Sequence, residues 1–338
     1  MSERIAKVGD GMLQNARFYL PGVLFSITIA MAATFVSGAY GGPTVLFALL
    51  LGMAFNFISA ESRLAPGIAF SSTSVLRIGV AALGVRITAE QVLRLGWSTL
   101  AGVAAAVALT ILFGLIAARL LGLNRHFGVL TAGAVAICGA SAAAAISSVL
   151  PRHEMHERDT VFTIIAVTTL STIAMVLYPL VGHVLHFSEA QNGVFLGGTI
   201  HDVAQVVGAG YSVSPGTGDI ATIIKLLRVA LLVPAVLSIS VLARRGTIAS
   251  GGKHPPLLPV FLVVFIGIVL LNSFHLVPPI IQTALGDVSR WAIVTAIAAL
   301  GAKTSLGALS QVGHRAMALM VAETVFIAVF VLTLIHIG

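Results

Sequence analysis

The sequence predicts an all-α, polytopic membrane protein. Of its 338 residues, 58% are hydrophobic and only 9% are charged, and the mean hydropathy is +1.04. Apolar runs of about 20 residues alternate with short polar segments, and an α-helix needs this length to cross the hydrocarbon core of a bilayer. The short connections leave no room for a soluble domain, so we expect a single transmembrane domain over residues 1–338.

The expected helices follow from eleven apolar stretches. Most of them approach the roughly 20 residues of a full crossing, although the second is short. Glycine interrupts the fifth, the seventh and the tenth, and a helix can break at such positions. In chain order the stretches are residues 18–37, 43–59, 66–86, 97–118, 127–150, 160–186, 190–213, 220–243, 256–275, 279–303 and 315–337.

The distribution of Lys and Arg predicts a cytoplasmic N-terminus and, after eleven crossings, a C-terminus on the far side. The charged loop 151–159 is the exception, because this count places it outside. If 127–150 and 190–213 were both re-entrant hairpins, the loop would lie inside. We expect full crossings instead, because the loop carries acids as well as bases.

The net charge of +7 does not indicate a nucleic-acid-binding protein. Most Lys and Arg residues lie at the ends of apolar stretches, where they orient a membrane protein, and no basic tract with interleaved aromatic residues occurs in the sequence. Cys138 is the only cysteine, so an intrachain disulfide is impossible and a cysteine-based metal cluster is not expected. The basic residues before the first stretch resemble the start of a signal peptide, but we interpret that stretch as a retained helix.

An ionisable pair, His201 and Asp202, interrupts the apolar stretch 190–213. An ionised side chain in the hydrocarbon region is costly, so such a pair is a candidate functional site. One alternative is a structural hydrogen-bonding pair that braces neighbouring helices. The other is a group that binds a substrate or exchanges protons, and Gln205 would share its face if the segment were helical.

Lys225 and Arg228 lie three residues apart within the eighth stretch. They can extend to the nearer membrane interface, or they can face the interior and either attract an anion or neutralise Asp202. Interior cations among such candidates outnumber the acids, which favours an anionic substrate. The same ambiguity applies to three other ionisable residues of apolar stretches: Arg77, Lys303 and Glu323.

The fifth stretch contains Gly133, Gly139 and a run of small residues from Ala140 to Ala145. They are typical of close helix packing in membranes. They are equally compatible with an unwound segment, where freed backbone groups line a cavity and the N-terminus of a half-helix faces an anion.

A short internal match points to repeats. Ala136–Ser141 can be laid on Ala298–Lys303, five stretches later and hence in opposite orientation. This relation predicts two inverted five-helix repeats, at 43–186 and 190–337, preceded by an extra helix at 18–37. A rival match of Ala81–Gly84 on Ala298–Gly301 cannot reflect the same duplication.

Sequence patterns give little support to an enzyme. His153-Glu-Met-His156 has an i,i+3 spacing rather than the i,i+4 spacing of zinc proteases. Ser141 lies in no Gly-x-Ser-x-Gly elbow, and the chain has no phosphate-binding loop of the ATPase type. We therefore expect no enzymatic activity, no metal and no cofactor.

Two motifs resemble those of a known family. Ala136-Ile-Cys-Gly-Ala-Ser-Ala142 and Gly197-Gly-Thr-Ile-His-Asp-Val-Ala-Gln-Val206 are similar to signatures of the YeiH-like family of proposed sulfate exporters. Lys225-Leu-Leu-Arg-Val229 and Ala298-Ala-Leu-Gly301 fit the same pattern, and the similarity spans roughly residues 20–335.

The resemblance implies a multi-pass protein of the bacterial inner membrane, related to the cation/proton antiporter and bile-acid symporter folds. Such proteins have inverted repeats whose broken helices cross near the bilayer centre, and they often form homodimers. By analogy, Cys138–Ser141 and Gly301–Thr304 would be the crossing segments. The chain lacks the adjacent Asp-Asp pair of some proton antiporters, which leaves the coupling ion open.

We therefore expect a secondary transporter that moves a small anion, such as sulfate, a sulfonate or a carboxylate, by alternating access. The alternatives are a proton- or cation-coupled carrier of another organic solute, an intramembrane enzyme that uses His201, Asp202 and Ser141, and a membrane scaffold. The expected substrate-binding residues are Cys138, Gly139, Ala140, Ser141, His201, Asp202, Gln205, Lys225, Arg228, Gly301, Lys303 and Thr304.

Overall fold

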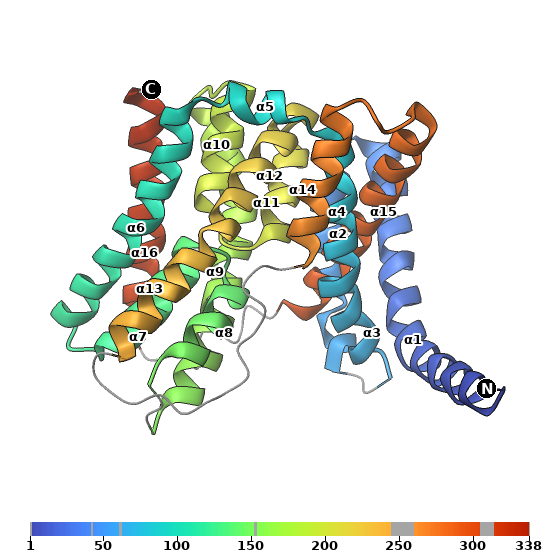
Figure 1. Cartoon of the computed structure of the whole chain (residues 1–338), viewed down its shortest axis with the longest axis horizontal. Helices are drawn as coiled ribbons and strands as arrows, with labels where there is room; N and C mark the ends of the chain where they lie inside the picture. Colours follow the sequence, from blue (N-terminus) through green and yellow to red (C-terminus); the bar gives the residue numbers. More distant parts are fainter. Residues whose placement is uncertain are drawn as a thin grey trace. The chain divides into compact units, whose positions relative to one another are not determined.

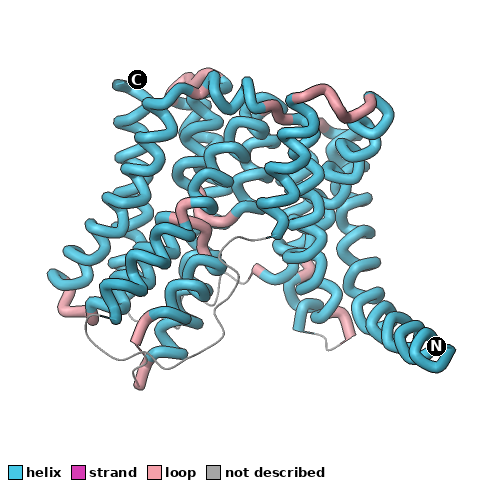
Figure 2. The backbone as a smooth tube through the Cα atoms, in the orientation of Figure 1, coloured by secondary structure: helices cyan, strands magenta, loops and turns pink. Residues whose placement is uncertain are grey.

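Figure 1 shows the computed structural model, which describes residues 2–41, 43–60, 63–151, 154–244, 260–304 and 314–337. Throughout these ranges the regular structure is helical, and Figure 2 shows the helices joined by short loops. The all-α prediction is confirmed for this part of the chain.

Seven helical segments of the described chain are long and apolar enough to cross a membrane. The protein is therefore polytopic, as predicted. The other four expected stretches contain shorter helices, so helix length supports seven of the eleven expected crossings. The seven segments are Phe18–Tyr40, Ala65–Arg86, Gly96–Leu120, His156–Val184, Pro215–Val241, Pro279–Lys303 and His314–His336.

The chain divides into two compact units. The first comprises Met1–Arg86 and Val264–Ser305, and the second comprises Ile87–Val263 and Leu306–Gly338. Each unit joins segments that are far apart in the sequence. This division does not follow the two expected repeats, and the internal repeat stays a prediction.

The first unit is built around α15 (Pro279–Lys303), which packs on α2 (Thr44–Ala54) and α4 (Leu76–Leu83). Gly52 of α2 faces the backbone of Ala298, and Gly301 faces the backbone of Leu49, so neither glycine has room for a side chain. The remaining elements are α1 (Ser2–Tyr40), η1 (Asn56–Ala60), α3 (Ala65–Phe70), the π-helical turn η2 (Ser71–Val75), η3 (Gly84–Arg86) and most of α14 (Val260–Ser273).

The broken crossing segment expected at Gly301–Thr304 is not present at residues 301–303. α15 continues as an unbroken helix to Lys303, and Thr304 is its C-cap. Gly301 lies in that helix because its missing side chain lets two backbones approach, rather than because the helix breaks there. Residues 305–313, which follow, lie outside the described part of the chain.

The second unit holds two pairs of short helices beside the long helix α9 (His156–Val184). The pairs are α7 (Arg125–Ala136) with α8 (Ala140–Val149), and α10 (Glu189–Thr199) with α11 (Val203–Val213). The other elements are α5 (Ala89–Arg94), α6 (Gly96–Leu120), α12 (Pro215–Ala230), α13 (Leu232–Arg244) and α16 (His314–Ile337), with the first residues of α14.

α7 and α8 form a hairpin. A Cβ atom added to Gly133 would overlap Ile146 Cδ1, although a straight helix would separate these residues by about 20 Å. At the open end, Ser147 Oγ of α8 lies 2.7 Å from Thr160 Oγ1 near the start of α9. In the same region the ring of Phe127 of α7 packs on the ring of Phe162 of α9, and the two ring centroids are 5.7 Å apart. The hairpin therefore enters and leaves beside the first turns of α9.

α10 and α11 form a second hairpin. Gly197 of α10 and Gly210 of α11 both pack on Ala221 of α12, although a straight helix would again separate the two glycines by about 20 Å. Thr217 Oγ1, at the start of α12, donates a hydrogen bond of 3.3 Å to Glu189 O at the start of α10. The start of α10 and the end of α11 therefore lie together.

The hairpins disagree with the expectation that 127–150 and 190–213 each cross the membrane, and they favour the re-entrant alternative. Each short helix has 10 to 12 residues, about 16 Å of helix against a hydrocarbon core of about 30 Å. Hydropathy cannot make this distinction, because an apolar hairpin and an apolar crossing have the same composition. In Figure 1, α7–α8 and α10–α11 extend toward opposite ends of the second unit.

Candidate functional site

The tips of the two hairpins meet about halfway along α9. The first tip is residues 137–139 and the second is residues 200–202. Ser171 Oγ, in the middle of α9, accepts hydrogen bonds from the backbone N–H groups of His201 (3.1 Å) and Asp202 (3.0 Å). The junction of the tips is therefore attached to a continuous transmembrane helix.

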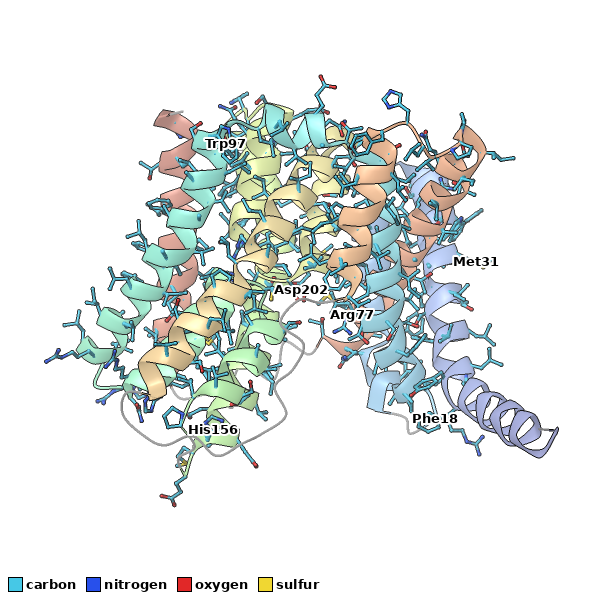
Figure 3. All side chains as sticks on the ribbon, in the orientation of Figure 1. Phe18, Met31, Arg77, Trp97, His156 and Asp202 are labelled. Atoms are coloured by element: carbon cyan, nitrogen blue, oxygen red, sulfur yellow. The ribbon has the colours of Figure 1, made fainter. Side chains whose placement is uncertain are left out.

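Gly139 makes the first tip tight. Its φ of +66° is in the region that favours glycine, and a Cβ atom there would lie 3.7 Å from His201 O of the other tip. Figure 3 shows Asp202 between Trp97 and His156, which lie toward opposite ends of this unit. The break expected in the fifth stretch is therefore present between Ala136 and Ala140. Gly139 in this break packs against the tip of the second hairpin.

Lys225 of α12 joins the two tips. Its Nζ donates hydrogen bonds to Ile137 O of the first tip (2.6 Å) and to Ile200 O of the second (3.1 Å), with a third to His201 O. The side chain is fully buried. All three ammonium donors are therefore directed at backbone carbonyls.

Arg228, one turn further along α12, also donates hydrogen bonds to backbone carbonyls of both hairpins, and it makes four of them. Its Nε and Nη2 donate to Ala136 O (2.9 Å) and Val135 O (2.8 Å) at the end of α7. Its Nη1 donates to Gly197 O (3.0 Å) and Ile200 O (2.9 Å) at the end of α10. This side chain is also fully buried.

Two cations therefore neutralise the C-terminal ends of α7 and α10. Each end carries free carbonyls and a partial negative charge, which would be expensive to bury alone. Of the alternatives considered for Lys225 and Arg228, extension to the membrane interface is wrong. Their hydrogen bonds go to the main chain, and sequence alone could not identify these partners because any residue supplies a carbonyl.

The N-terminal ends of α8 and α11 lie at the same junction. α11 begins after Asp202, whose Oδ1 accepts a 2.8 Å hydrogen bond from the N–H group of Ala204. α8 begins after Gly139 with no side-chain cap, and Ser141 in its first turn is exposed while Ala140 is half-buried. The start of α8 therefore presents backbone N–H groups next to two buried cations.

His201 connects the second tip to two further elements. Its Nδ1 lies 3.0 Å from Val135 O, and its Nε2 lies 3.1 Å from Thr324 Oγ1 of α16. A carbonyl only accepts, so Nδ1 carries a hydrogen and Nε2 faces the hydroxyl. The same hydroxyl is 2.8 Å from Met320 O, so it can turn between two acceptors.

Gln205 and Cys138 are buried near the junction. Gln205 Nε2 donates a 2.7 Å hydrogen bond to Thr172 Oγ1 of α9, whereas its Oε1 has no hydrogen-bond partner among the described residues. Ser171, Thr172 and Thr324 were missed by the sequence reasoning. In the sequence, each of them is a hydroxyl-bearing residue in the middle of an apolar stretch. Such residues are too common in membrane helices to identify a site.

Three predicted site residues lie in the first unit. Lys303 Nζ is 3.3 Å from Ser72 Oγ of η2, and Thr304 Oγ1 donates to Leu300 O of its own helix. Gly301 packs on α2. The structure therefore brings together nine of the twelve predicted residues in the second unit, and these three belong to the first unit.

The segment His153-Glu-Met-His156 contacts α8 through a hydrogen bond between two side chains. His156 Nε2 lies 2.9 Å from Ser147 Oγ, whereas His153 lies outside the described residues. In the part of the chain that the structure describes, no three His, Cys, Asp or Glu side chains gather as metal ligands would.

Comparison with known proteins assigns a family. The family model described as "Conserved hypothetical protein 698" matches residues 21–320. The chain belongs to this family. Its members include UPF0324 membrane proteins, and the resemblance drawn from the motifs at Ala136 and Gly197 is thereby confirmed.

The relatives cover nearly the whole chain. The UPF0324 membrane protein TauZ of Paracoccus pantotrophus is 53% identical over 329 residues, or 96% of each chain. A UPF0324 membrane protein of Chlorobaculum tepidum is 54% identical over 98% of this chain and 94% of its own length. Together with the apolar spans, these relatives identify a multi-pass protein of a bacterial membrane.

Proposed function

We propose that this protein is a secondary transporter that carries a small anion across the bacterial inner membrane by alternating access. The observation that carries the proposal is the meeting of two half-membrane hairpins at a junction held by Lys225 and Arg228. Irregular backbone at membrane depth is tolerated where protein buries it or where it lines a cavity. In many secondary transporters, discontinuous helices of this kind form the substrate site.

The charge at the junction supports an anionic substrate. Lys225 and Arg228 cancel the partial negative ends of α7 and α10, so the uncapped N-terminus of α8 remains as a positive end. Ala140 and Ser141 would bind the anion there with backbone N–H groups, whereas the Gly139 N–H group already donates to Ala134 O. Sulfate, an organic sulfonate and a carboxylate all have oxygens that accept such hydrogen bonds.

An enzyme is a weaker alternative. His201 directs its ring nitrogens at Val135 O and the Thr324 hydroxyl, so neither nitrogen is directed at Ser141 as a general base would be. The proposal therefore includes no catalytic residue, no metal and no cofactor. Its partners are the solute and the lipid bilayer, with a homodimer as in related folds and no nucleic acid.

Counterflow in proteoliposomes tests the proposal. Vesicles loaded with unlabelled sulfate should accumulate labelled sulfate, and external methanesulfonate or acetate should compete if the site accepts those classes. Ser141→Trp would fill the space at the start of α8 and should abolish counterflow. Ser148→Trp is the matched control, because Ser148 is also an exposed serine of α8 but lies at its other end.

Counterflow retained by Ser141→Trp, with the wild type active, would separate the substrate site from the start of α8. Folded wild-type protein that exchanges none of the three anions would refute anion transport. Thermal shifts with the same anions would then show whether any of them binds.

A further inference from the structure

A second buried carboxyl group lies outside the junction. Glu323 of α16 is fully buried, and it is about 14 Å from the start of that helix at the helical rise. That distance is about half of the hydrocarbon core. Thr131 Oγ1 of α7 lies 2.9 Å from Glu323 Oε1, whereas Oε2 has no hydrogen-bond partner among the described residues.

The surroundings of this carboxyl are closely packed. The backbone of α6 at Gly114 packs directly against the Glu323 carboxyl group, since a Cβ atom on Gly114 would lie 2.5 Å from Glu323 Oε1. Thr131 is fully buried as well. An ionised carboxylate with one bare oxygen is costly at such a place, whereas a carboxylic acid needs only one acceptor for its hydrogen.

The Thr131 hydroxyl suits both protonation states of Glu323. It lies 3.1 Å from Phe127 O in its own helix as well as 2.9 Å from Glu323 Oε1. With a carboxylate, the hydroxyl donates to Oε1. With a carboxylic acid, Oε1 donates its hydrogen to Thr131 Oγ1, and the hydroxyl turns to Phe127 O. A proton can therefore be gained or lost here without a change of contact partner.

Glu323 is also placed to influence the hairpin tips. It touches α7 of the first hairpin through Thr131, and the next residue, Thr324, touches His201 at the tip of the second. α16 therefore contacts both hairpins at consecutive positions. A change in the charge of Glu323 alters the contact between α16 and α7 directly.

Charged groups near this carboxyl are few on the helices that pack against it. Arg119 ends α6, and Arg125 and His126 begin α7, at helix ends rather than beside Glu323. The titratable groups of α9 and α10 lie mainly near the helix ends, at 156–159, Tyr178, His183 and Glu189. His314, Arg315 and His336 lie at the ends of α16. The buried titratable group that contacts the same stretch of α16 is His201, through Thr324. Lys225 and Arg228 both donate to Ile200 O, the carbonyl of the residue before His201.

We infer that Glu323 is a buried proton-binding site that couples transport to the proton gradient. This inference rests on the proposed transporter function. In the cycle, the carboxylate takes a proton from the aqueous phase on one side, becomes a neutral acid against Thr131, and releases the proton to the other side. The start of α8, at the junction held by Lys225 and Arg228, then binds the substrate, and Glu323 binds the coupling ion.

Difference infrared spectroscopy tests the proton site without any substrate. Purified wild-type protein in lipid should show the carbonyl stretch of a protonated carboxyl group that disappears at alkaline pH. Glu323→Gln should lack this band, and Glu157→Gln, an exposed acid at the start of α9, should retain it. Thr131→Val should move the band to a higher frequency, because the hydrogen bond to the carboxyl is lost, and this variant serves if Glu323→Gln does not fold.

Labelled sulfate in proteoliposomes tests the coupling. In the wild type and in Glu157→Gln, an imposed pH gradient should change the rate of net uptake. In Glu323→Gln, sulfate exchange should persist while uptake falls to the level without a gradient. Gradient-driven uptake by Glu323→Gln at the wild-type rate would overturn the inference, as would a sodium gradient that drives uptake where a proton gradient does not.

The two proposals fail separately. If wild-type vesicles exchange no anion, the transporter proposal and the coupling role fall, and the infrared band still decides whether Glu323 binds a proton. If the band is the same in the wild type, Glu323→Gln and Thr131→Val, the proton site itself is refuted.

Discussion

Replacing Arg228 by methionine tests the interpretation of the hairpin junction. Methionine keeps much of the length of the side chain and removes the charge and all the donors. Arg228 donates to four carbonyls, but Val135 O still accepts from His201 and Ile200 O still accepts from Lys225. The loss therefore falls mainly on Ala136 O and Gly197 O.

Leaving a buried acceptor unsatisfied costs about 1–3 kcal/mol. Two such carbonyls predict a loss of roughly 2–6 kcal/mol, which is a large part of the usual 5–15 kcal/mol stability of a folded protein. Arg228→Lys should recover only part of the loss, because an ammonium group lacks the planar fork that reaches both α7 and α10.

The assay is thermal unfolding of purified protein in detergent, followed by loss of the monodisperse peak. Arg119→Met is the matched control, because Arg119 is exposed in the last turn of α6. We expect a clearly lower melting temperature for Arg228→Met and little change for Arg119→Met. Equal melting temperatures would show that the carbonyl ends of the hairpins do not depend on this cation.

Three further predictions follow from the hairpins. A single cysteine at Glu154, in a Cys138→Ser background, should react from the cytoplasmic side; labelling from the outside would restore two full crossings. Gly197→Ala should cost roughly 1–3 kcal/mol, because its Cβ would overlap the backbone of Ala221, whereas Gly38→Ala, with open space around it, should be tolerated in the same unfolding assay. Asp202→Asn should keep the N-cap of α11, whereas Asp202→Ala should lose about 0.5–2 kcal/mol; equal melting temperatures would contradict a capping role.

The hairpins also bring the membrane topology into better agreement with the distribution of Lys and Arg in the loops. With both stretches re-entrant and the other nine crossing, the loop 151–159 moves to the cytoplasmic side. Arg152 and Arg158 then join the basic residues there, and Arg86 and Arg94 remain outside. The positive-inside rule therefore favours this topology over eleven crossings.

Sequence reasoning found the breaks and the charged residues but not their contacts. Apolar length and glycine content predicted helices and a break near Gly139, because both are local properties. The same signal failed at Gly301, where glycine serves close packing. The partners of Lys225 and Arg228 are backbone carbonyls more than 20 positions away, and no side-chain pattern encodes them.

The way in which Lys225 and Arg228 divide their donors limits how the protein can move. Each cation holds carbonyls from both hairpins, so drawing the tips apart would strip hydrogen bonds from two buried charges at once. The tips should consequently travel as one rigid block together with α12. In the proposed transport cycle, the shift between inward-open and outward-open states would then take place at the surfaces around that block, where hydroxyl groups of Ser171, Thr172 and Thr324 supply the polar contacts that must be exchanged.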